Sequence, residues 1–271
     1  MIDIARDIVK PYVKTNKHDA ADAEAICEAV QRLNMRFVPM KNVDQQAILA
    51  VHRARQGLIK ARTAQANQIR CFLREFGLVV PVGINFVYQR VPVLLDQAKD
   101  ELPGVLRELI LRLLAHTKEL DHQINELERQ IHLWHRSNAL SRKLEKVPGI
   151  GPITASALVA SIGDAKSFAN GRQLAAWLGL VPRQHSTGGK TNLLGISKRG
   201  DTYLRTLLIH GGRAIIRCAG QKPPNTNSWL DRILARRHKN VVTVALPNRN
   251  ARIVWALLAH DREFQANYAP A

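Results

Sequence analysis

The segment RQHSTGGKTNLLGISKRGD, residues 183–201, places hydroxyl side chains beside glycines and among cations. Ser186 and Thr187 precede Gly188 and Gly189, a combination that interrupts a helix and favours a loop that another backbone can approach closely. A serine hydroxyl can attack phosphorus while cations stabilise the charge that gathers on the non-bridging oxygens. The segment therefore fits phosphoryl transfer, and it also fits phosphate binding without chemistry.

The cations around this hydroxyl are numerous, and a single acid, Asp201, lies among them. Between residues 183 and 217 they are Arg183, Lys190, Lys198, Arg199, Arg205, Arg213 and Arg217. Helical spacing resumes after Asp201, with the leucines expected inside and the cations elsewhere. We predict that the first five of these cations bind nucleic acid.

The composition extends this conclusion to the whole chain. Its 271 residues include 40 Lys and Arg against 22 Asp and Glu, a formal net charge of +18. Such an excess costs self-repulsion unless a polyanion neutralises it, and nucleic acid is the first candidate. No apolar run reaches the roughly 18–20 residues of a membrane-spanning helix, and the three cysteines lack disulfide or zinc-site spacing. We therefore expect a soluble, cytoplasmic nucleic-acid binder.

Helical periodicity dominates the sequence and predicts a mainly α fold. Residues 19–33 and 43–77 are expected to be helices, the second ending at Gly77. From residue 45 to 74 the second helix carries six Lys or Arg and no acid, which favours contact with nucleic acid over a solvated face. A loop-rich link punctuated by VVPVG and LPG is expected next.

A heptad pattern then runs from Leu106 to Trp134. Its positions alternate in steps of four and three, and only Thr117 interrupts the apolar series. The pattern predicts a coiled-coil stretch of about four heptads, or one arm of an antiparallel helical pair. The sequence leaves open whether the partner is the 43–77 helix of the same chain or the arm of a second chain.

The turn VPGIG, residues 147–151, separates an apolar helix end from a helix expected to begin near Pro152. The pattern resembles a helix-hairpin-helix, in which backbone N–H groups of a glycine turn hold a DNA phosphate without reading sequence. A plain turn between two helices fits the same residues. The adjacent basic region favours DNA, and we predict that Gly149 and Gly151 contact nucleic acid.

The whole pattern resembles the DEDD transposases of the insertion sequence 110/1111 family. The segments that carry the resemblance are YVKTNKHDAADAEAI, VPGIG, LAAWLGLVPRQHSTGGKTNLLGISKRGDTYLRTLLIHGGRA and ARRHKNVVTVALPNRNARIVWALL. The resemblance implies a bacterial, nucleoid-associated transposase that cuts and rejoins double-stranded DNA. It also implies a homo-oligomer and a guide RNA transcribed from the flank of the element.

The resemblance implies three domains. Residues 1–80 would be a remnant of an α/β RuvC-like (RNase H-like) nuclease domain, and residues 81–143 a linker and coiled-coil arm of long helices. Residues 144–271 would be a helical transposase domain with the helix-hairpin-helix.

In the family, a strand with an Asp and a later Glu precede the block that KHDAADA matches. This chain reaches that block at residue 17. We therefore expect an N-terminally truncated transposase, impaired in catalysis and still able to bind DNA.

The resemblance also implies the site residues. Asp19 and Asp22 match the last two acids of the DEDD set, and their spacing places both on one helix face, where they could share Mg²⁺. The family serine matches Ser186 or, in an alignment without a gap, Thr187; we choose Ser186. With two acids missing, Mg²⁺ binding is expected to be weakened or lost.

The alternative function is that of a non-enzymatic helix-hairpin-helix nucleic-acid-binding protein. It explains the charge and the glycine turn but neither the paired acids nor the Ser-Thr-Gly-Gly loop.

Overall fold

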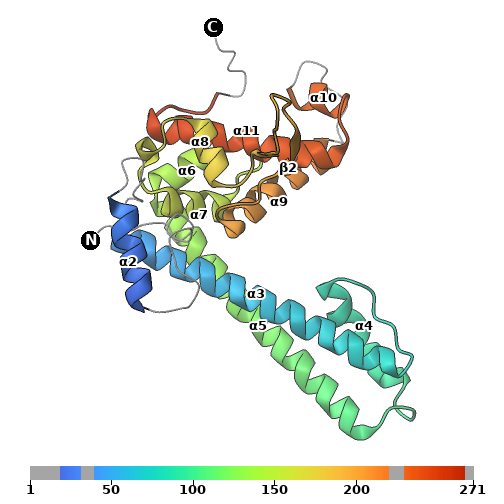
Figure 1. Ribbon diagram of the computed structural model, residues 1–271. Helices are drawn as coiled ribbons and strands as arrows, with labels where there is room; N and C mark the ends of the chain where they lie inside the picture. The colour runs from blue at the N-terminus through green and yellow to red at the C-terminus, as the bar shows by residue number, and fades with distance from the viewer. Residues whose placement is uncertain (1–18, 32–39, 220–228, 266–271) are drawn as a thin grey trace. The chain divides into compact units, whose positions relative to one another are not determined.

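The computed structural model describes residues 19–31, 40–219 and 229–265 (Figure 1). These residues are mainly helical, as predicted, and their one sheet has two short strands. The chain divides into two compact units, which we call the arm (residues 47–137) and the main unit (residues 1–46 with 138–271). None of the described helices is long and apolar enough to cross a membrane. The domain boundaries at residues 80 and 143, and the RuvC-like remnant, stay predictions.

The arm contains α3 (Val43–Glu75, whose first residues belong to the main unit), α4 (Ile84–Gln97) and α5 (Gly104–Ser137). The described part of the main unit contains α2 (Asp19–Val30), α6 (Ala139–Glu145), α7 (Pro152–Ile162), the 3-10 helix η2 (Ala165–Ser167), α8 (Gly171–Trp177), β1 (Pro182–Gln184), β2 (Leu193–Ile196), α9 (Thr202–Ala219), α10 (Trp229–Leu234) and α11 (Lys239–Ala259). The predicted helix at 43–77 is thus confirmed to within two residues of its end. The predicted helix at 19–33 is confirmed from Asp19 to Val30, and its last two predicted residues lie outside the described ranges.

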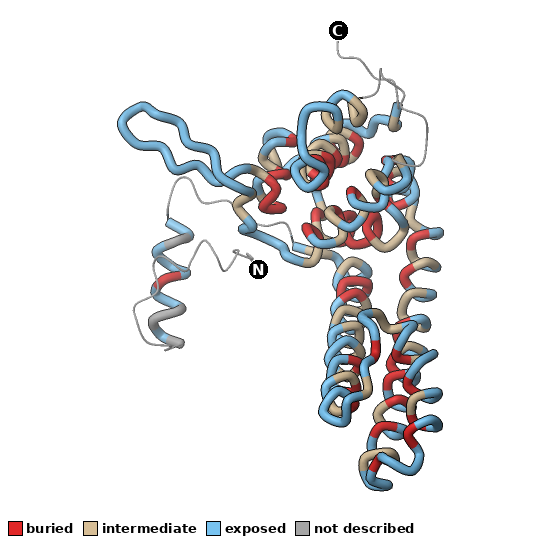
Figure 2. Tube along the Cα trace, turned by 90° about the vertical axis from the view of Figure 1, so that its right-hand side faces the viewer, coloured by how far each residue is buried: buried red, intermediate tan, exposed pale blue. Residues whose placement is uncertain are grey.

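In the arm, α3 and α5 lie side by side and run antiparallel (Figures 1 and 2). Arg55 on α3 donates two hydrogen bonds to Glu128 Oε1 on α5, at 2.8 Å from Nε and 2.5 Å from Nη2. Two turns further along α3, Arg62 pairs with Asp121. Of the two partners that the heptad pattern allowed, the structure shows the helix of the same chain.

These pairs change the interpretation of the cationic run on α3. Arg55 and Arg62 bind carboxylates of α5, and Arg70 donates hydrogen bonds to backbone oxygens of the loop that follows α3. Three of the six cations therefore stabilise the arm. The exposed cations that remain on α3 are Arg53, Lys60 and Arg74.

The prediction of a loop-rich link was wrong for residues 84–97, which form α4. Pro92 lies inside this helix, where proline removes a backbone donor and normally ends helical structure. Tertiary packing compensates, because Val87, Val91 and Leu95 are buried in a core shared with α3 and α5. The prolines and glycines of this segment therefore predicted a loop at a place where tertiary packing forms a helix.

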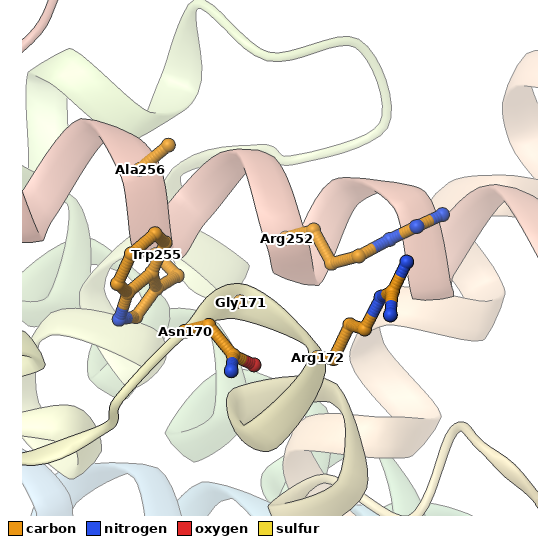
Figure 3. A pocket seen from close by; sticks show the side chains of 6 residues that line it. All are labelled: Asn170, Gly171, Arg172, Arg252, Trp255 and Ala256. Carbon is orange, nitrogen blue, oxygen red and sulfur yellow. The ribbon is translucent and has the colours of Figure 1, made fainter.

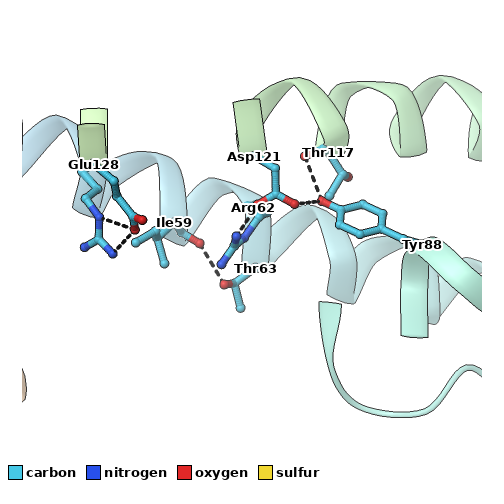
Figure 4. Close-up of polar contacts among 8 residues, drawn as sticks. Ile59, Arg62, Thr63, Tyr88, Thr117, Asp121 and Glu128 are labelled. Carbon is cyan, nitrogen blue, oxygen red and sulfur yellow. Dashed lines mark hydrogen bonds and ion pairs between the residues drawn. The ribbon is translucent and has the colours of Figure 1, made fainter. Parts of the chain in front are cut away.

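A polar network crosses the apolar seam of the arm at Thr117 (Figure 4). Tyr88 Oη on α4 lies within hydrogen-bond distance of the Asp121 carboxylate and, at 3.1 Å, of Thr117 O. Asp121 also accepts a hydrogen bond from Arg62, and Thr117 Oγ1 donates to Leu113 O at 2.8 Å. Burial, followed by the hydrogen bond to Asp121, raises the pKa of Tyr88 above its usual value, so the phenol keeps its proton. The polar break in the heptad is thus where α4 is joined to the helical pair.

α7 forms the centre of the main unit, since eight of its eleven residues are buried. α6 and α9 pack against α7, and α11 packs against α6, α8, α9 and α10. α11 also binds loops through side-chain amides. Asn250 Nδ2 donates to Pro148 O in the α6–α7 turn at 2.8 Å, and Asn248 Nδ2 donates to Leu180 O before β1 at 3.0 Å. These bonds satisfy carbonyl groups of turns that no regular ladder would pair.

Close backbone contact fixes the base of the β1–β2 hairpin. A Cβ atom placed on Gly179 would lie 1.9 Å from Arg199 O, and one placed on Gly200 would lie 1.9 Å from Trp177 O. Both glycines also have positive φ, 71° and 81°. Side chains of L-residues are excluded at both positions, by space and by backbone conformation.

The buried histidine of α3 makes arm stability depend on pH. Burial, and to a lesser degree the charge of Arg55, lower the pKa of His52 from 6.5 to about 4. The unfolded chain therefore binds the proton more readily between these values, and stability is complete above about pH 6.5 and falls as the pH drops towards 4. We expect the arm to lose on the order of 1–2 kcal/mol between about pH 7 and pH 5, measured by hydrogen exchange of α3 and α5 amides. His52→Leu should flatten this pH dependence of stability. His122→Leu, at an exposed position of α5, should leave it intact. Equal stability profiles against pH for the unaltered chain and both variants would show that His52 is not the cause.

The hairpin base provides a matched pair of glycine substitutions. Gly200→Ala should destabilise the main unit by about 2–3 kcal/mol, because the new methyl group meets Trp177 O in a left-handed conformation. Gly195→Ala, where a Cβ atom would meet nothing within 4 Å, should change the stability by less than about 0.5 kcal/mol. Urea unfolding of the two variants measures the difference, and indistinguishable midpoints would show that the close contact is not needed.

Candidate catalytic and nucleic-acid-binding site

Ser186 and Thr187 lie near the tip of the β1–β2 hairpin. The strands pair antiparallel, with Pro182 opposite Ile196, and the pairing continues to the tip, where Lys190 N donates to Thr187 O at 3.1 Å. All residues from 182 to 195 are exposed (Figure 2). The hydroxyl groups are therefore open to a large ligand.

The glycine pair of this segment is required by the turn. Gly188 and Gly189 have φ of 56° and 75°, and positive φ at both central residues is the requirement of a two-residue type I′ hairpin turn. A Cβ atom on either glycine would meet nothing within 4 Å. The predicted break in helical structure is confirmed. In the described part of the chain, no neighbouring segment lies against these two glycines. They are needed for the backbone conformation of the turn alone.

The Ser186 hydroxyl is oriented by one neighbour. Gln184 Nε2 donates a hydrogen bond to Ser186 Oγ at 2.8 Å. Among the described residues, this amide is the only hydrogen-bond partner of the hydroxyl. An amide donor can orient a serine but cannot accept its proton. The hairpin therefore presents an accessible alcohol to which no base is hydrogen-bonded in the described ranges.

Four of the predicted nucleic-acid-binding cations are exposed along this hairpin and its base, and they are Arg183, Lys190, Lys198 and Arg199. None of them forms an ion pair with an acid in the described part of the chain. The nearby acid, Asp201, caps α9, because its Oδ1 accepts a hydrogen bond from Leu204 N at 3.0 Å. The positive charge around Ser186 thus remains available to an anionic ligand.

Arg205 has an internal position instead. Its side chain is buried, and Nη1 donates to Arg199 O at 3.1 Å and to Leu178 O at 3.3 Å. Nη2 donates to Thr202 Oγ1 at 3.1 Å. The guanidinium therefore holds the backbone that carries Arg199, and contact between Arg205 and nucleic acid stays an untested prediction.

The glycine turn between α6 and α7 is partly explained by packing. Gly149 has a φ of 86°, and a Cβ atom on Gly211 of α9 would lie 1.8 Å from Gly149 O. Gly151 is exposed and precedes α7 without a side-chain cap, so the first amide groups of that helix have no capping side chain. Gly149 thus serves the contact with α9, while Gly151 stays a candidate for phosphate contact.

α9 carries further basic side chains for which no role was predicted. His210, Arg213 and Arg217 are exposed and are spaced by three and four residues, which places them on one face of the helix. The 18 residues of α9 include no acid. The helical spacing of its leucines predicted an outer face for the cations, and Arg213 and Arg217 confirm it.

The predicted acids lie at the start of α2. Asp19 is its first residue and Asp22 follows within the first turn, and both side chains lie outside the part that the structure describes. Two carboxylates are suitable donors for Mg²⁺, which prefers oxygen ligands, although they supply only part of a coordination shell. The described residues contain no group of three or more His, Cys, Asp and Glu side chains that could hold a metal ion. The metal site stays a prediction.

Comparison with known proteins identifies the relatives of this chain. The model of the Transposase IS116/IS110/IS902 family matches residues 141–226, and a DEDD transposase model of the IS110 type matches residues 3–77. A probable family 20 transposase of Pseudomonas aeruginosa is 52% identical over 259 residues, covering 95% of this chain and 77% of that protein. The transposase for insertion sequence element IS1111A of Coxiella burnetii is 42% identical over 257 residues, covering 95% and 71%. The transposase for IS1328 of Yersinia enterocolitica is 42% identical over 261 residues, covering 96% and 77%. The chain belongs to the IS116/IS110/IS902 family of transposases.

Proposed function

We propose that this chain is a DNA transposase that cuts and rejoins strands of a mobile element through the hydroxyl of Ser186. One observation carries the proposal: Ser186 is exposed near the tip of a hairpin whose cations have no acidic partner among the described residues. A DNA phosphate would satisfy those cations and bring phosphorus close to the hydroxyl oxygen.

In the proposed step, Ser186 Oγ forms a bond to phosphorus while the bond from phosphorus to one deoxyribose oxygen breaks. The hydroxyl proton is released, and the departing sugar oxygen takes up a proton. Arg183 and Lys190 would stabilise the negative charge on the non-bridging oxygens. Gln184 would hold Oγ in position through its 2.8 Å hydrogen bond.

Asp19 and Asp22 would hold Mg²⁺ as part of the acidic site that the family resemblance implies. A bound Mg²⁺ polarises phosphoryl oxygens and supplies positive charge where the transition state needs it. The carboxylates of this chain would bring two of the oxygen ligands, and their spacing of three residues along α2 allows both to face one ion.

Double-stranded DNA is the proposed partner of the hairpin and of the exposed face of α9. Gly151 would add a backbone contact to phosphate at the start of α7. A guide RNA from the flank of the element and a homo-oligomer belong to the same proposal, on the basis of the family resemblance.

The nucleophile is tested by covalent trapping. The chain is incubated with Mg²⁺, end-labelled DNA that carries the ends of the element, and RNA transcribed from its flank. Because two acids of the DEDD set are missing, we expect this chain to give only a low yield of a protein–DNA adduct that survives detergent. Ser186→Ala should abolish the adduct and Thr187→Val should retain it. An adduct that persists in Ser186→Ala and disappears in Thr187→Val would move the nucleophile to Thr187. Absence of any adduct from the unaltered chain would contradict the proposed chemistry.

The acids are tested by separating binding from chemistry. Asp19→Asn and Asp22→Asn should each lower the yield of Mg²⁺-dependent adduct by about ten-fold or more. Both should leave DNA affinity within about two-fold, because neither change removes a cation. Glu24→Gln, also on α2, controls for the loss of one negative charge. Full adduct yield from both Asn variants would exclude these acids from the site.

A second candidate function is DNA binding without strand cleavage. The observation that favours it is that, among the described residues, no base is hydrogen-bonded to Ser186. In that case the unaltered chain would bind DNA and form no adduct under any metal condition, and the hairpin cations would account for the affinity.

A further inference from the structure

A shallow cavity of about 350 Å³ lies between the start of α8 and the second half of α11 (Figure 3). Its lining residues are Asn170, Gly171, Arg172, Arg252, Trp255 and Ala256. All six lie outside the hairpin, and none has a role in the proposed chemistry.

Close packing of the two helices brings the cations of this cavity together. A Cβ atom on Gly171 would lie 2.9 Å from Arg252 Cα and 3.0 Å from Arg252 O, so α8 begins directly against α11. Arg172 follows Gly171, and Figure 3 shows the two guanidinium groups beside each other at one end of the cavity. Both arginines are exposed, and neither forms a hydrogen bond or ion pair with another residue in the described ranges. Two like charges at close range repel each other unless an anion lies between them.

The polar groups left free in the cavity are all donors. Each guanidinium offers up to five N–H groups and no acceptor. Asn170 Oδ1 already accepts a hydrogen bond from Gln173 N at 3.0 Å, while its Nδ2 group has no partner among the described residues. A ligand that matches this set must be rich in acceptors and negatively charged.

Neighbouring cations reinforce the positive potential. Arg249, one turn before Arg252 on α11, lies over the Trp229 ring of α10 at 4.6 Å from its centroid. Burial, followed by the charges of Arg252 and Arg232, lowers the pKa of Arg249. Cations from three helices, α8, α10 and α11, therefore contribute to the field at this cavity.

The other lining group is an aromatic ring in a fixed orientation. Trp255 Nε1 donates a hydrogen bond to Phe168 O at 3.0 Å, and the ring meets that of His260 edge-on at a centroid distance of 4.9 Å. The indole is half-buried and lines the cavity beside Ala256 (Figure 3). A ring held in this way loses little entropy when a planar or apolar group packs against it.

We propose that Arg172, Arg252, Asn170 and Trp255 form a binding site for one nucleotide unit of a nucleic-acid strand, with the phosphodiester between the two guanidinium groups and the sugar or base against Trp255. The planar fork of each arginine matches phosphate oxygens, and the indole matches the apolar part of the nucleotide. An acidic peptide would satisfy the arginines but would make no use of the aromatic surface. The choice of nucleic acid rests on the proposed function of the chain, and the site itself takes no part in strand cleavage.

The test measures binding alone, so that failure of the chemistry leaves it intact. The full chain is titrated, with a chelator present, against fluorescent oligonucleotides of one sequence as single-stranded DNA, duplex DNA and RNA, at several salt concentrations. Arg172→Gln with Arg252→Gln should weaken binding of the preferred strand by about ten-fold. It should also reduce the slope of log affinity against log salt by about 0.7–0.9, the loss of one neutralised phosphate. Comparison of the three oligonucleotides identifies the source of the phosphodiester.

Two matched variants keep the result interpretable. Arg112→Gln with Arg136→Gln removes the same two charges from exposed positions of α5 and should leave the slope unchanged. Arg172→Lys with Arg252→Lys keeps the charge but not the fork, so the slope should be retained while affinity falls. The site is refuted if the Gln pair binds like the unaltered chain, if the unaltered chain binds no oligonucleotide, or if polyglutamate of equal charge competes as well as the oligonucleotide.

Discussion

The main unit depends on α11, because the side chains of this helix hold segments that have no regular structure of their own. Asn250 binds the α6–α7 turn, Asn248 binds the chain just before β1, and Trp255 binds the segment after η2. Each bond joins a side-chain N–H group to a backbone carbonyl of a loop, and such carbonyls are costly to leave unpaired when they are removed from water. The turn with Gly149, the hairpin with Ser186 and the cavity with Arg172 are therefore positioned by one helix.

The cations of the chain fall into two groups that composition cannot separate. Arg55 and Arg62 pair with acids inside the arm, and Arg205 binds backbone oxygens at the base of the hairpin. These side chains stabilise the fold by satisfying buried or half-buried acceptors. The cations of the hairpin and of the outer face of α9 lack such partners in the described part of the chain, and their self-repulsion is relieved only by an external anion. A net charge of +18 thus overstates the surface that is free for nucleic acid.

Ser186 combines exposure with an orienting hydrogen bond, and in the described ranges its hydroxyl is hydrogen-bonded to no base. This arrangement differs from a self-contained hydrolase site, in which the base contacts the nucleophile directly. Under the proposed function, this arrangement would keep the alcohol inert until DNA and the acidic site are both in place. In that interpretation the hairpin delivers the nucleophile and the cations align the phosphate.

Local sequence determined the long helices α3 and α5, the break at Ser186–Gly189 and the family, because helical periodicity, paired glycines and long shared segments are properties of neighbouring residues. The heptad series predicted α5, including the polar break at Thr117, but it could not choose the partner helix, since one apolar seam fits an intramolecular and an intermolecular contact equally well. Tertiary structure made that choice through Arg55 and Arg62. It also formed α4 across Pro92, where burial of three apolar side chains outweighs the missing backbone donor. The internal position of Arg205, the contact of Gly149 with Gly211, and the meeting of Arg172 with Arg252 join residues from about 6 to 80 positions apart. No local pattern contains such contacts, because they depend on which surfaces the helices bury against one another.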